Sequence, residues 1–132
     1  MELRFRENGK WFSFSAKAII IEDDCVLLAT NKTVDWYYPI GGGAWHGETA
    51  EQAVIRECLE ETGVHFEIDR LVFIHENFFK GDWDVVKGCD CQEAACYFLM
   101  KPRGTKELNS NSYITNAKGE LVRESLRWVP ID

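Results

Sequence analysis

The sequence predicts a mixed α/β fold, and two observations support this prediction. Strand-like segments lie on both sides of one strongly marked amphipathic helix, near residues 11–21, 25–29, 66–79 and 92–100. Turn-forming residues separate these segments, and the sequence contains no internal repeat. A chain of 132 residues is long enough for one core, so we expect residues 1–132 to form a single domain.

The strands are expected to be joined by short turns. A strand near residues 3–6 precedes a turn at residues 7–10, and the long strand region 11–21 turns back at Asp23 and Asp24. Residues 30–38 are expected to form a loop, followed by a glycine loop that leads into the helix. After the last two strands, the polar residues 105–120 are expected to form a mobile loop.

The helix has sequence signals at both ends. Thr49 and Gln52 have the spacing of a capping box, so the helix should begin at Ala50. Gly63 supplies the left-handed residue that ends it. At about 100° per residue the acidic side chains fall on one edge. The adjoining arc can face a core and consists of Val54, Ile55, Cys58 and Leu59.

The acidic edge of this helix predicts a metal site. Glu57 lies three and four residues before Glu60 and Glu61, and like charges at these spacings repel by about 0.2–0.5 kcal/mol per pair. Arg56 can hold one carboxylate, but one guanidinium cannot neutralise four acids when Glu48 is included. Oxygen ligands suit Mg²⁺ or Mn²⁺, which substrate phosphates then complete. A solvated acidic face is the alternative for an isolated Glu-Glu pair, and the full constellation argues against it.

The stretch 42–64 resembles the Nudix box, G-x5-E-x7-R-E-U-x-E-E-x-G-U, where U is a bulky aliphatic residue. Its seven fixed positions are filled by Gly42, Glu48, Arg56, Glu57, Glu60, Glu61 and Gly63. Cys58 departs mildly from the usual Leu, Ile or Val, because a buried cysteine behaves as a small hydrophobe. Ile40 replaces a common proline and Trp45 fills an often charged position, so both could reshape the pocket wall.

This resemblance implies an α/β/α sandwich with a mixed β-sheet and the box helix packed on it. It also implies hydrolysis of a nucleoside diphosphate linked to another group, dependent on Mg²⁺ with Mn²⁺ as a substitute. The implied metal ligands are Glu57, Glu60, Glu61 and the Gly41 carbonyl, with Glu48 as an accessory ligand. Arg56 would orient the carboxylates. The general base stays open between Glu57 and Glu93, which opens a later strand.

Aromatic residues outside the box are candidates for substrate binding. Trp36 and Tyr38 precede the glycine loop, whereas Phe79 and Trp83 follow the next strand. Together they could stack on a nucleobase, and packing in the core is an equally weighted alternative. His46 lies in the candidate active-site loop and could contact a phosphate, with an ordinary surface position as the alternative.

The substrate class follows only by exclusion. Markers of relatives that cleave ADP-ribose, diadenosine polyphosphates or coenzyme A are not visible after the box, which leaves a nucleoside triphosphate, damaged ones included. A non-catalytic Nudix-like module that senses a nucleotide for a protein partner is the rival hypothesis. Residues 128–132 end where relatives usually continue into a helix, so we expect truncation or a homodimer, marked by an exposed apolar sheet face.

Charge and cysteine content restrict the remaining functions. A net charge of -7 repels nucleic-acid backbones and argues against a polynucleotide partner. No apolar stretch has the length of a leader or a membrane span. Five cysteines at irregular spacing fit reduced thiols better than disulfides or a zinc site. We therefore expect a cytoplasmic protein that binds a small nucleotide.

Overall fold

The computed structural model describes residues 1–82, 86–109, 113–115 and 120–132. Trp83, one of the predicted substrate-binding residues, lies outside these ranges. Within them the chain forms one α-helix and nine strands. The elements are β1 (Arg4–Glu7), β2 (Lys10–Ile19), β3 (Ile21–Glu22), β4 (Cys25–Asn31), β5 (Tyr38–Gly43), α1 (Ala50–Thr62), β6 (Ile68–Lys80), β7 (Asp90–Met100), β8 (Tyr113–Thr115) and β9 (Leu121–Pro130).

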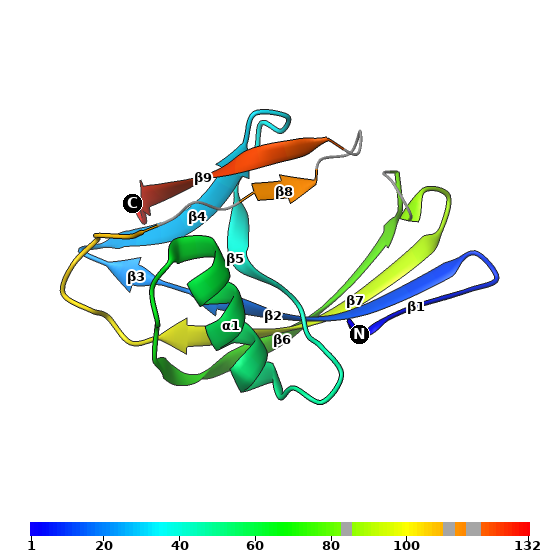
Figure 1. Cartoon of the computed structure of the whole chain (residues 1–132), viewed down its shortest axis with the longest axis horizontal. Helices are drawn as coiled ribbons and strands as arrows, with labels where there is room; N and C mark the ends of the chain where they lie inside the picture. Colours follow the sequence, from blue (N-terminus) through cyan, green and yellow to red (C-terminus); the bar gives the residue numbers. More distant parts are fainter. Residues whose placement is uncertain (83–85, 110–112, 116–119) are drawn as a thin grey trace.

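The strands form one mixed sheet in the order β6-β7-β2-β5-β4-β9-β8, with β1 paired to β2 and β3 to β4. β2 and β7 run parallel from Lys10–Asp90 to Ile19–Leu99, and the other described pairs are antiparallel. Figure 1 shows α1 against the sheet, while β1–β2 and β6–β7 extend beyond the helix. This arrangement confirms the predicted mixed α/β fold with the box helix packed on the sheet. In the described residues α1 is the only α-helix of the expected sandwich.

The ends of α1 confirm the sequence signals. The Thr49 hydroxyl accepts from the Gln52 amide N–H at 3.0 Å, and Gln52 Oε1 accepts from the Thr49 N–H at 2.9 Å. Gly63 has φ 71°, and its N–H bonds to the Leu59 carbonyl. The capping box and the left-handed glycine therefore set the two ends of the helix locally. No helix in the described part of the chain is long and apolar enough to cross a membrane.

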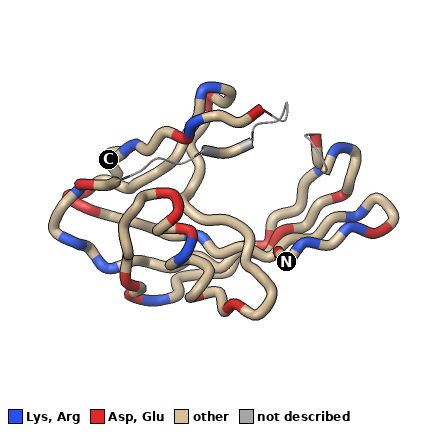
Figure 2. The backbone as a smooth tube through the Cα atoms, viewed as in Figure 1, with Lys and Arg blue, Asp and Glu red and all other residues tan. Residues whose placement is uncertain are grey.

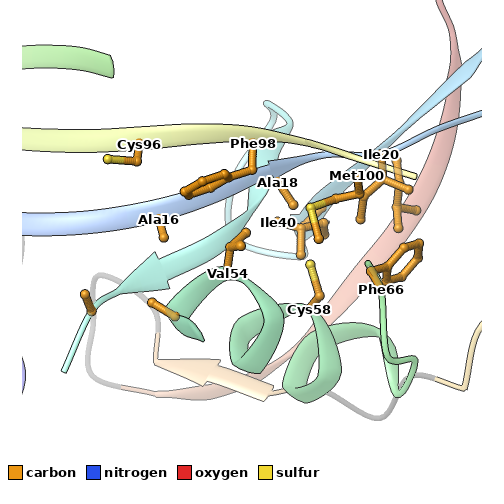
Figure 3. Close-up of a cluster of buried hydrophobic side chains, with 14 residues drawn as sticks. Ala16, Ala18, Ile20, Ile40, Val54, Cys58, Phe66, Cys96, Phe98 and Met100 are labelled. Carbon is orange, nitrogen blue, oxygen red and sulfur yellow. The ribbon is translucent and has the colours of Figure 1, made fainter. Parts of the chain in front are cut away.

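The core lies between α1 and the central strands. Val54 and Cys58 on the helix are fully buried and face Ala18, Ile40 and Phe98 of the sheet, as Figure 3 shows. Burial raises the pKa of the Cys58 thiol to about 12, so the thiol stays protonated and packs as an apolar group. Cysteine at this box position therefore preserves the packing of helix on sheet.

Two segments differ from the expectations. The glycine segment is the end of β5 rather than a loop, because Gly41, Gly42 and Gly43 pair with Lys17, Ala16 and Ser15 of β2. Glycine is required at positions 41 and 42, because a Cβ atom would collide with the Ala16 carbonyl at the first position and with the Glu57 carboxylate at the second. The chain after residue 120 forms β9, which pairs with β4 from Asn31–Glu124 to Cys25–Pro130. This strand was not predicted, and it carries a residue of the candidate site.

Candidate metal and active site

Arg56 is the centre of the acidic cluster on α1. Its Nε donates to Glu48 Oε2 at 2.8 Å, and its Nη1 donates to Glu57 Oε1 at 3.0 Å. Nη1 also reaches Glu60 Oε1 at 3.2 Å, and Nη2 donates to the Gly43 carbonyl at 3.0 Å. The sequence predicted that Arg56 holds one carboxylate, whereas it holds three. Figure 2 shows these acidic and basic segments next to each other on the helix.

Trp45 covers the outer side of this cluster. The Arg56 guanidinium carbon lies 3.9 Å from the centroid of the Trp45 ring, within the range of a cation–π contact. The Trp45 backbone N–H also donates to Glu48 Oε1 at 2.9 Å. Hydrogen bonding to Arg56 lowers the pKa of Glu48, so this carboxylate is held in its charged form. Trp45 and Glu48 thus fix the guanidinium from two directions.

Glu57 lies directly against strand β5. A Cβ atom at Gly42 would be 2.8 Å from Glu57 Oε1, so a side chain at position 42 would displace the carboxylate. Burial is the main cause that raises the pKa of Glu57, and Glu60 adds to it, whereas Arg56 and Lys17 act in the opposite direction. The invariant spacing between Gly42 and Glu57 in the box motif therefore has a steric reason in this chain.

Lys17 brings a second cation to the cluster. It pairs with Gly41 across β2 and β5, and its Cδ would lie 3.0 Å from a Cβ at that glycine. Among the described residues no ion pair with Lys17 occurs. Its ammonium group is therefore near the acids without being tied to one of them, and it could contact a substrate phosphate. Lys17 carries no functional signal in the sequence, because a single lysine at the start of an apolar strand is common.

Glu61 points into the protein on the other side of the helix edge. It is 8% exposed, and its Oε2 accepts from the Gly41 N–H at 2.8 Å. Gly41 has φ +142°, and a Cβ there would collide with the Ala16 carbonyl, so only glycine fits this position. The contact formed by Gly41 is thus through its amide N–H. Metal binding by its carbonyl stays a prediction.

Glu124 is a further acid of this site that sequence reasoning missed. It comes from β9, is 3% exposed and stands opposite Asn31 of β4. Its side chain is hydrogen-bonded to Glu61 and to Tyr38, whose hydroxyl also accepts from Asn31 Nδ2 at 3.3 Å. Burial, followed by the nearby Glu124 and Glu57, raises the pKa of Glu61 far above its usual range. A buried pair of carboxylates must share a proton or attract a cation.

A signal for Glu124 was present in the sequence. Val122, Glu124, Leu126 and Trp128 alternate along the chain and therefore share one face of a strand. A carboxylate on an otherwise apolar face is rarely buried without a partner. Recognising β9 as a strand would have placed Glu124 among the candidate ligands.

Glu93 lies on β7, and strand β2 separates β7 from the glycine strand β5. Its Oε2 accepts from the Ser15 hydroxyl at 2.9 Å, and Ser15 stands opposite Gly43. Among the described residues no contact joins Glu93 to Glu57. Ser15 and Gly43 instead separate Glu93 from Arg56. A role for Glu93 as general base therefore stays a prediction.

The predicted aromatic residues that the structure describes, Trp36, Tyr38 and Phe79, differ in their surroundings. Tyr38 packs against the main core and bonds to Asn31, while Phe79 packs with Val86, Cys89 and Cys91 in a separate cluster. Burial raises the pKa of the Tyr38 hydroxyl, so it remains neutral. Trp36 and His46 are exposed. Trp36 is thus open to a ligand, whereas Tyr38 and Phe79 are partly buried against the two apolar clusters, and their contact with a substrate stays a prediction.

The donor atoms of the cluster fit a hard divalent cation. The acids on α1 and β9 offer only carboxylate oxygens, which Mg²⁺ and Mn²⁺ prefer. In the described part of the chain no three acidic, histidine or cysteine side chains already converge as a metal centre. Three of the acids turn instead toward Arg56. Cation binding would therefore require Glu57 and Glu60 to turn away from the guanidinium.

Comparison with known proteins shows the family of the chain. The NUDIX domain matches residues 12–132, and the chain belongs to the Nudix family. It is 32% identical over 100 residues to a MutT-like protein of Streptomyces ambofaciens, covering 75% of this chain and 58% of that protein. The chain thus spans less than two thirds of that curated relative.

Two solved structures support the fold. The crystal structure of the MutT NUDIX hydrolase from Burkholderia pseudomallei superimposes with a TM-score of 0.67 at 20% identity, covering 90% of this chain and 83% of that one. The bifunctional NMN adenylyltransferase/ADP ribose pyrophosphatase of Francisella tularensis, complexed with AMP and a manganese ion, gives a TM-score of 0.58 at 20% identity. It covers 96% of this chain and 36% of that one. At these identities the likeness concerns the fold alone.

Proposed function

We propose that this protein hydrolyses a phosphoanhydride bond in a small nucleotide, with a nucleoside triphosphate, damaged ones included, as the default substrate. The observation that carries the proposal is the set of box carboxylates held by Arg56 against Gly42 and Gly43, with Lys17 beside them. A sensor without catalysis would have little reason to keep so many repelling carboxylates together. Family membership and the MutT-like relative support the same reaction class.

The metal would be held by Glu57, Glu60 and Glu61, with Glu48 and the Gly41 carbonyl as further ligands and Mg²⁺ or Mn²⁺ as the ion. A bound cation of this kind neutralises charge on a diphosphate and lowers the pKa of water. We add Glu124 to the candidate ligands, because its carboxylate is buried beside Glu61. The manganese ion in the Francisella tularensis structure supports a divalent cation in this fold.

The side chains of this protein would then divide the remaining tasks. Lys17 would bind a substrate phosphate oxygen, because its side chain lies beside Gly41, its charge acts on Glu57 and it has no ion pair among the described residues. Arg56 would orient Glu57 and Glu60 through Nη1. Glu57, whose raised pKa favours proton uptake, is the first candidate for the base, with Glu93 as the second. Trp36 and His46 are the exposed candidates for substrate contact.

The proposal extends to the domain organisation, cellular location and oligomeric state of the protein. We propose that residues 1–132 act as one domain in the cytoplasm, because the five cysteines are all free thiols and four of them are buried. The net charge of -7 disfavours a polynucleotide substrate. We also propose a homodimer, which is consistent with the exposed apolar side chains of Ile74 and Phe78 on β6.

The test is hydrolysis of a panel of nucleoside triphosphates, dinucleoside polyphosphates and nucleotide sugars in Mg²⁺, Mn²⁺ or EDTA. Phosphate release would be measured after a pyrophosphatase and, in parallel, after a phosphatase. We expect metal-dependent turnover of one class, and Glu57→Gln should lower it by about 100-fold or more. Glu51→Gln is the matched control, since Glu51 is an exposed acid in the first turn of the same helix. No turnover of any class, or full activity of Glu57→Gln, would contradict the proposal.

A further inference from the structure

A hollow of about 320 Å³ lies on the part of the sheet where β1–β2 and β6–β7 extend beyond the helix (Figure 1). None of the residues that line it belongs to α1 or to the glycine strand β5. Its volume is close to the lower limit of about 300 Å³ for small-molecule pockets, so it has room for one ring system rather than for a whole nucleotide. This hollow, which we call the hairpin pocket, is therefore a candidate binding site apart from the box cluster.

One row of side chains across four strands shapes the hairpin pocket. The strand register places Phe5 of β1 opposite Phe12 of β2, and Phe12 beside Gln92 of β7. Gln92 in turn stands opposite Phe78 of β6. Residues paired in this way share one face of the sheet, so the three phenyl rings and the amide lie on the same side. The hairpin pocket thus has aromatic rings on both sides of Gln92.

The phenyl rings of this row are accessible to a ligand. Phe5 and Phe78 are 52% and 67% exposed, whereas Phe12 is partly buried. The rings of Phe5 and Phe12 lie 6.4 Å apart between their centroids and are inclined by only 12°, which is within the range of packed aromatic pairs. Open aromatic rings of this kind provide stacking surfaces for a planar ligand.

Gln92 adds a polar group to the aromatic row. Its side chain is partly buried, and among the residues that the structure describes it has no hydrogen-bond partner. A glutamine amide offers both a donor and an acceptor, so a ligand edge that carries the complementary pair satisfies both at once. The N6 amino group and N7 of adenine form such an edge, and a glutamine can bind them together.

The next row toward the hairpin turns restricts the charge of the ligand. It consists of Glu7, Lys10, Asp90 and Lys80, which are paired in this order across the four strands. The signs alternate, and Lys80 Nζ lies 3.1 Å from Asp90 Oδ1, so the row has a formal charge of zero. A polyphosphate or an organic cation would meet repulsion as well as attraction here. The hairpin pocket therefore fits an uncharged ring better than an ionic group.

We propose that the hairpin pocket binds an adenine base, which stacks between Phe12 and Phe78 and pairs its N6 amino group and N7 with the Gln92 amide. One stacked base with one paired edge predicts a dissociation constant of about 1 mM for adenosine. The proposal does not rest on the proposed activity, because a nucleoside without phosphates suffices for binding.

The position of the hairpin pocket allows two sources for the base. Phe12 lies four residues before Ala16, which pairs with Gly42 beside Glu57, so about 13 Å of strand separate the pocket from the box acids. An adenine there could belong to the molecule whose phosphates reach these acids, or to a separate ligand. Both sources share the chemistry of the base, and the second experiment below distinguishes them.

The first test is a titration of the full chain with adenosine in EDTA, followed by the NMR signals of the Gln92 side-chain amide. We expect a saturable shift, which Gln92→Met and Phe78→Ala should each weaken by at least about fivefold. Phe73→Ala is the matched control, because Phe73 is also exposed on β6 but pairs with Tyr97, on the opposite face from Gln92. Inosine, which lacks the N6 donor, should bind more weakly than adenosine. No saturable shift, or equal binding by Gln92→Met, would overturn the proposal.

The second experiment adds a non-hydrolysable ATP analogue with Mg²⁺ and follows the signals of Gly42 and Gln92 together. If the base is part of the substrate, adenosine should displace the analogue from both positions. If the base belongs to a separate ligand, saturating adenosine should leave the Gly42 shift unchanged. Either result supports the adenine site and identifies its source, whereas an analogue that leaves Gln92 unshifted would contradict it. Adenosine binding without any turnover of nucleotides would contradict the proposed activity alone.

Discussion

Two groups of carboxylates meet at α1, and the contacts that hold their negative charges differ. Glu48, Glu57 and Glu60 are tied to the guanidinium of Arg56 at 2.8–3.2 Å. Glu61 and Glu124 are buried at 8% and 3% exposure, and their established contacts are the Gly41 amide, the Tyr38 hydroxyl and each other. The first group and the guanidinium that holds it all lie within residues 48–60. The second group is assembled from three distant parts of the chain.

This difference separates carboxylates that are held by a charged donor from carboxylates that are buried beside each other. In the Arg56 group three carboxylates face one guanidinium, so the group keeps an excess of negative charge although each carboxylate has a charged donor. The buried group gains only neutral donors from the contacts described, and burial makes a like-charged pair costly. Glu57 belongs to the Arg56 group and also raises the pKa of Glu61. A divalent cation would therefore act where the two groups meet.

The largest expected effect comes from removing the cation of the first group. Arg56→Ala would leave three carboxylates and the Gly43 carbonyl without their common donor, while the Arg56 side chain is only 17% exposed. Breaking such a buried pair should reduce the free energy of unfolding by about 3 kcal/mol. Denaturant unfolding in EDTA measures this change. An Arg56→Ala variant as stable as the wild type would show that the guanidinium does not stabilise the fold through these carboxylates.

The control for Arg56 is an arginine with the same kind of partner at the surface. Arg70 bonds to Asp69 at 2.9 Å, but its side chain is 66% exposed. Solvent screens such a pair, so Arg70→Ala should change stability by less than about 0.5 kcal/mol. Comparing the two variants separates the stabilisation that comes from the buried cluster from the effect of removing an arginine at the surface.

The second prediction tests the buried group formed by Glu61 and Glu124. Glu124→Gln removes one of the causes that raise the pKa of Glu61, and a raised carboxyl pKa destabilises the folded state above the ordinary pKa, so in EDTA at neutral pH the variant should raise the free energy of unfolding by about 1 kcal/mol. Mg²⁺ should stabilise the wild type, by about 2.7 kcal/mol at a hundredfold excess over the dissociation constant. Glu124→Gln should lose most of this gain. Thermal unfolding with and without Mg²⁺ measures both effects.

Glu51→Gln is the control for the loss of one acid, since Glu51 lies exposed on α1 outside both groups. It should show neither the stabilisation in EDTA nor the weaker response to Mg²⁺. If Glu124→Gln destabilised the protein in EDTA, the two buried carboxylates would not repel each other. If its response to Mg²⁺ matched that of the wild type, Glu124 would be no ligand.

The same contrast explains which parts of the site could be predicted from the sequence. Thr49, Gln52 and Gly63 set the helix ends through contacts within four residues, and these local signals were confirmed. The i,i+4 relation of Arg56 and Glu60 is likewise local and could be derived from helical geometry. Everything in the Arg56 group lies on one continuous segment. For such a segment, spacing along the chain translates directly into distance.

The buried group could not be derived in this way. Glu124 reaches Glu61 only because β9 pairs with β4 and β4 pairs with β5, which is a matter of sheet order. The glycines at positions 41–43 were expected in a loop because glycine favours turns, whereas close packing against Ala16 and Glu57 requires them in a strand. Tyr38 was considered a stacking residue, but its hydroxyl belongs to the buried network. These assignments depend on contacts between distant residues.

The smallest expected effect concerns the outer side of the Arg56 group. Trp45 stacks on the guanidinium at 3.9 Å and is 43% exposed, so Trp45→Leu should cost about 0.5–1 kcal/mol of stability. Trp45→Phe retains a ring and should recover part of this loss. The backbone bond from residue 45 to Glu48 remains in both variants, so the difference between them isolates the aromatic contact. Equal stabilities of the Leu and Phe variants would show that the ring adds no more than apolar cover, and Arg56 would then owe its position to the carboxylates alone.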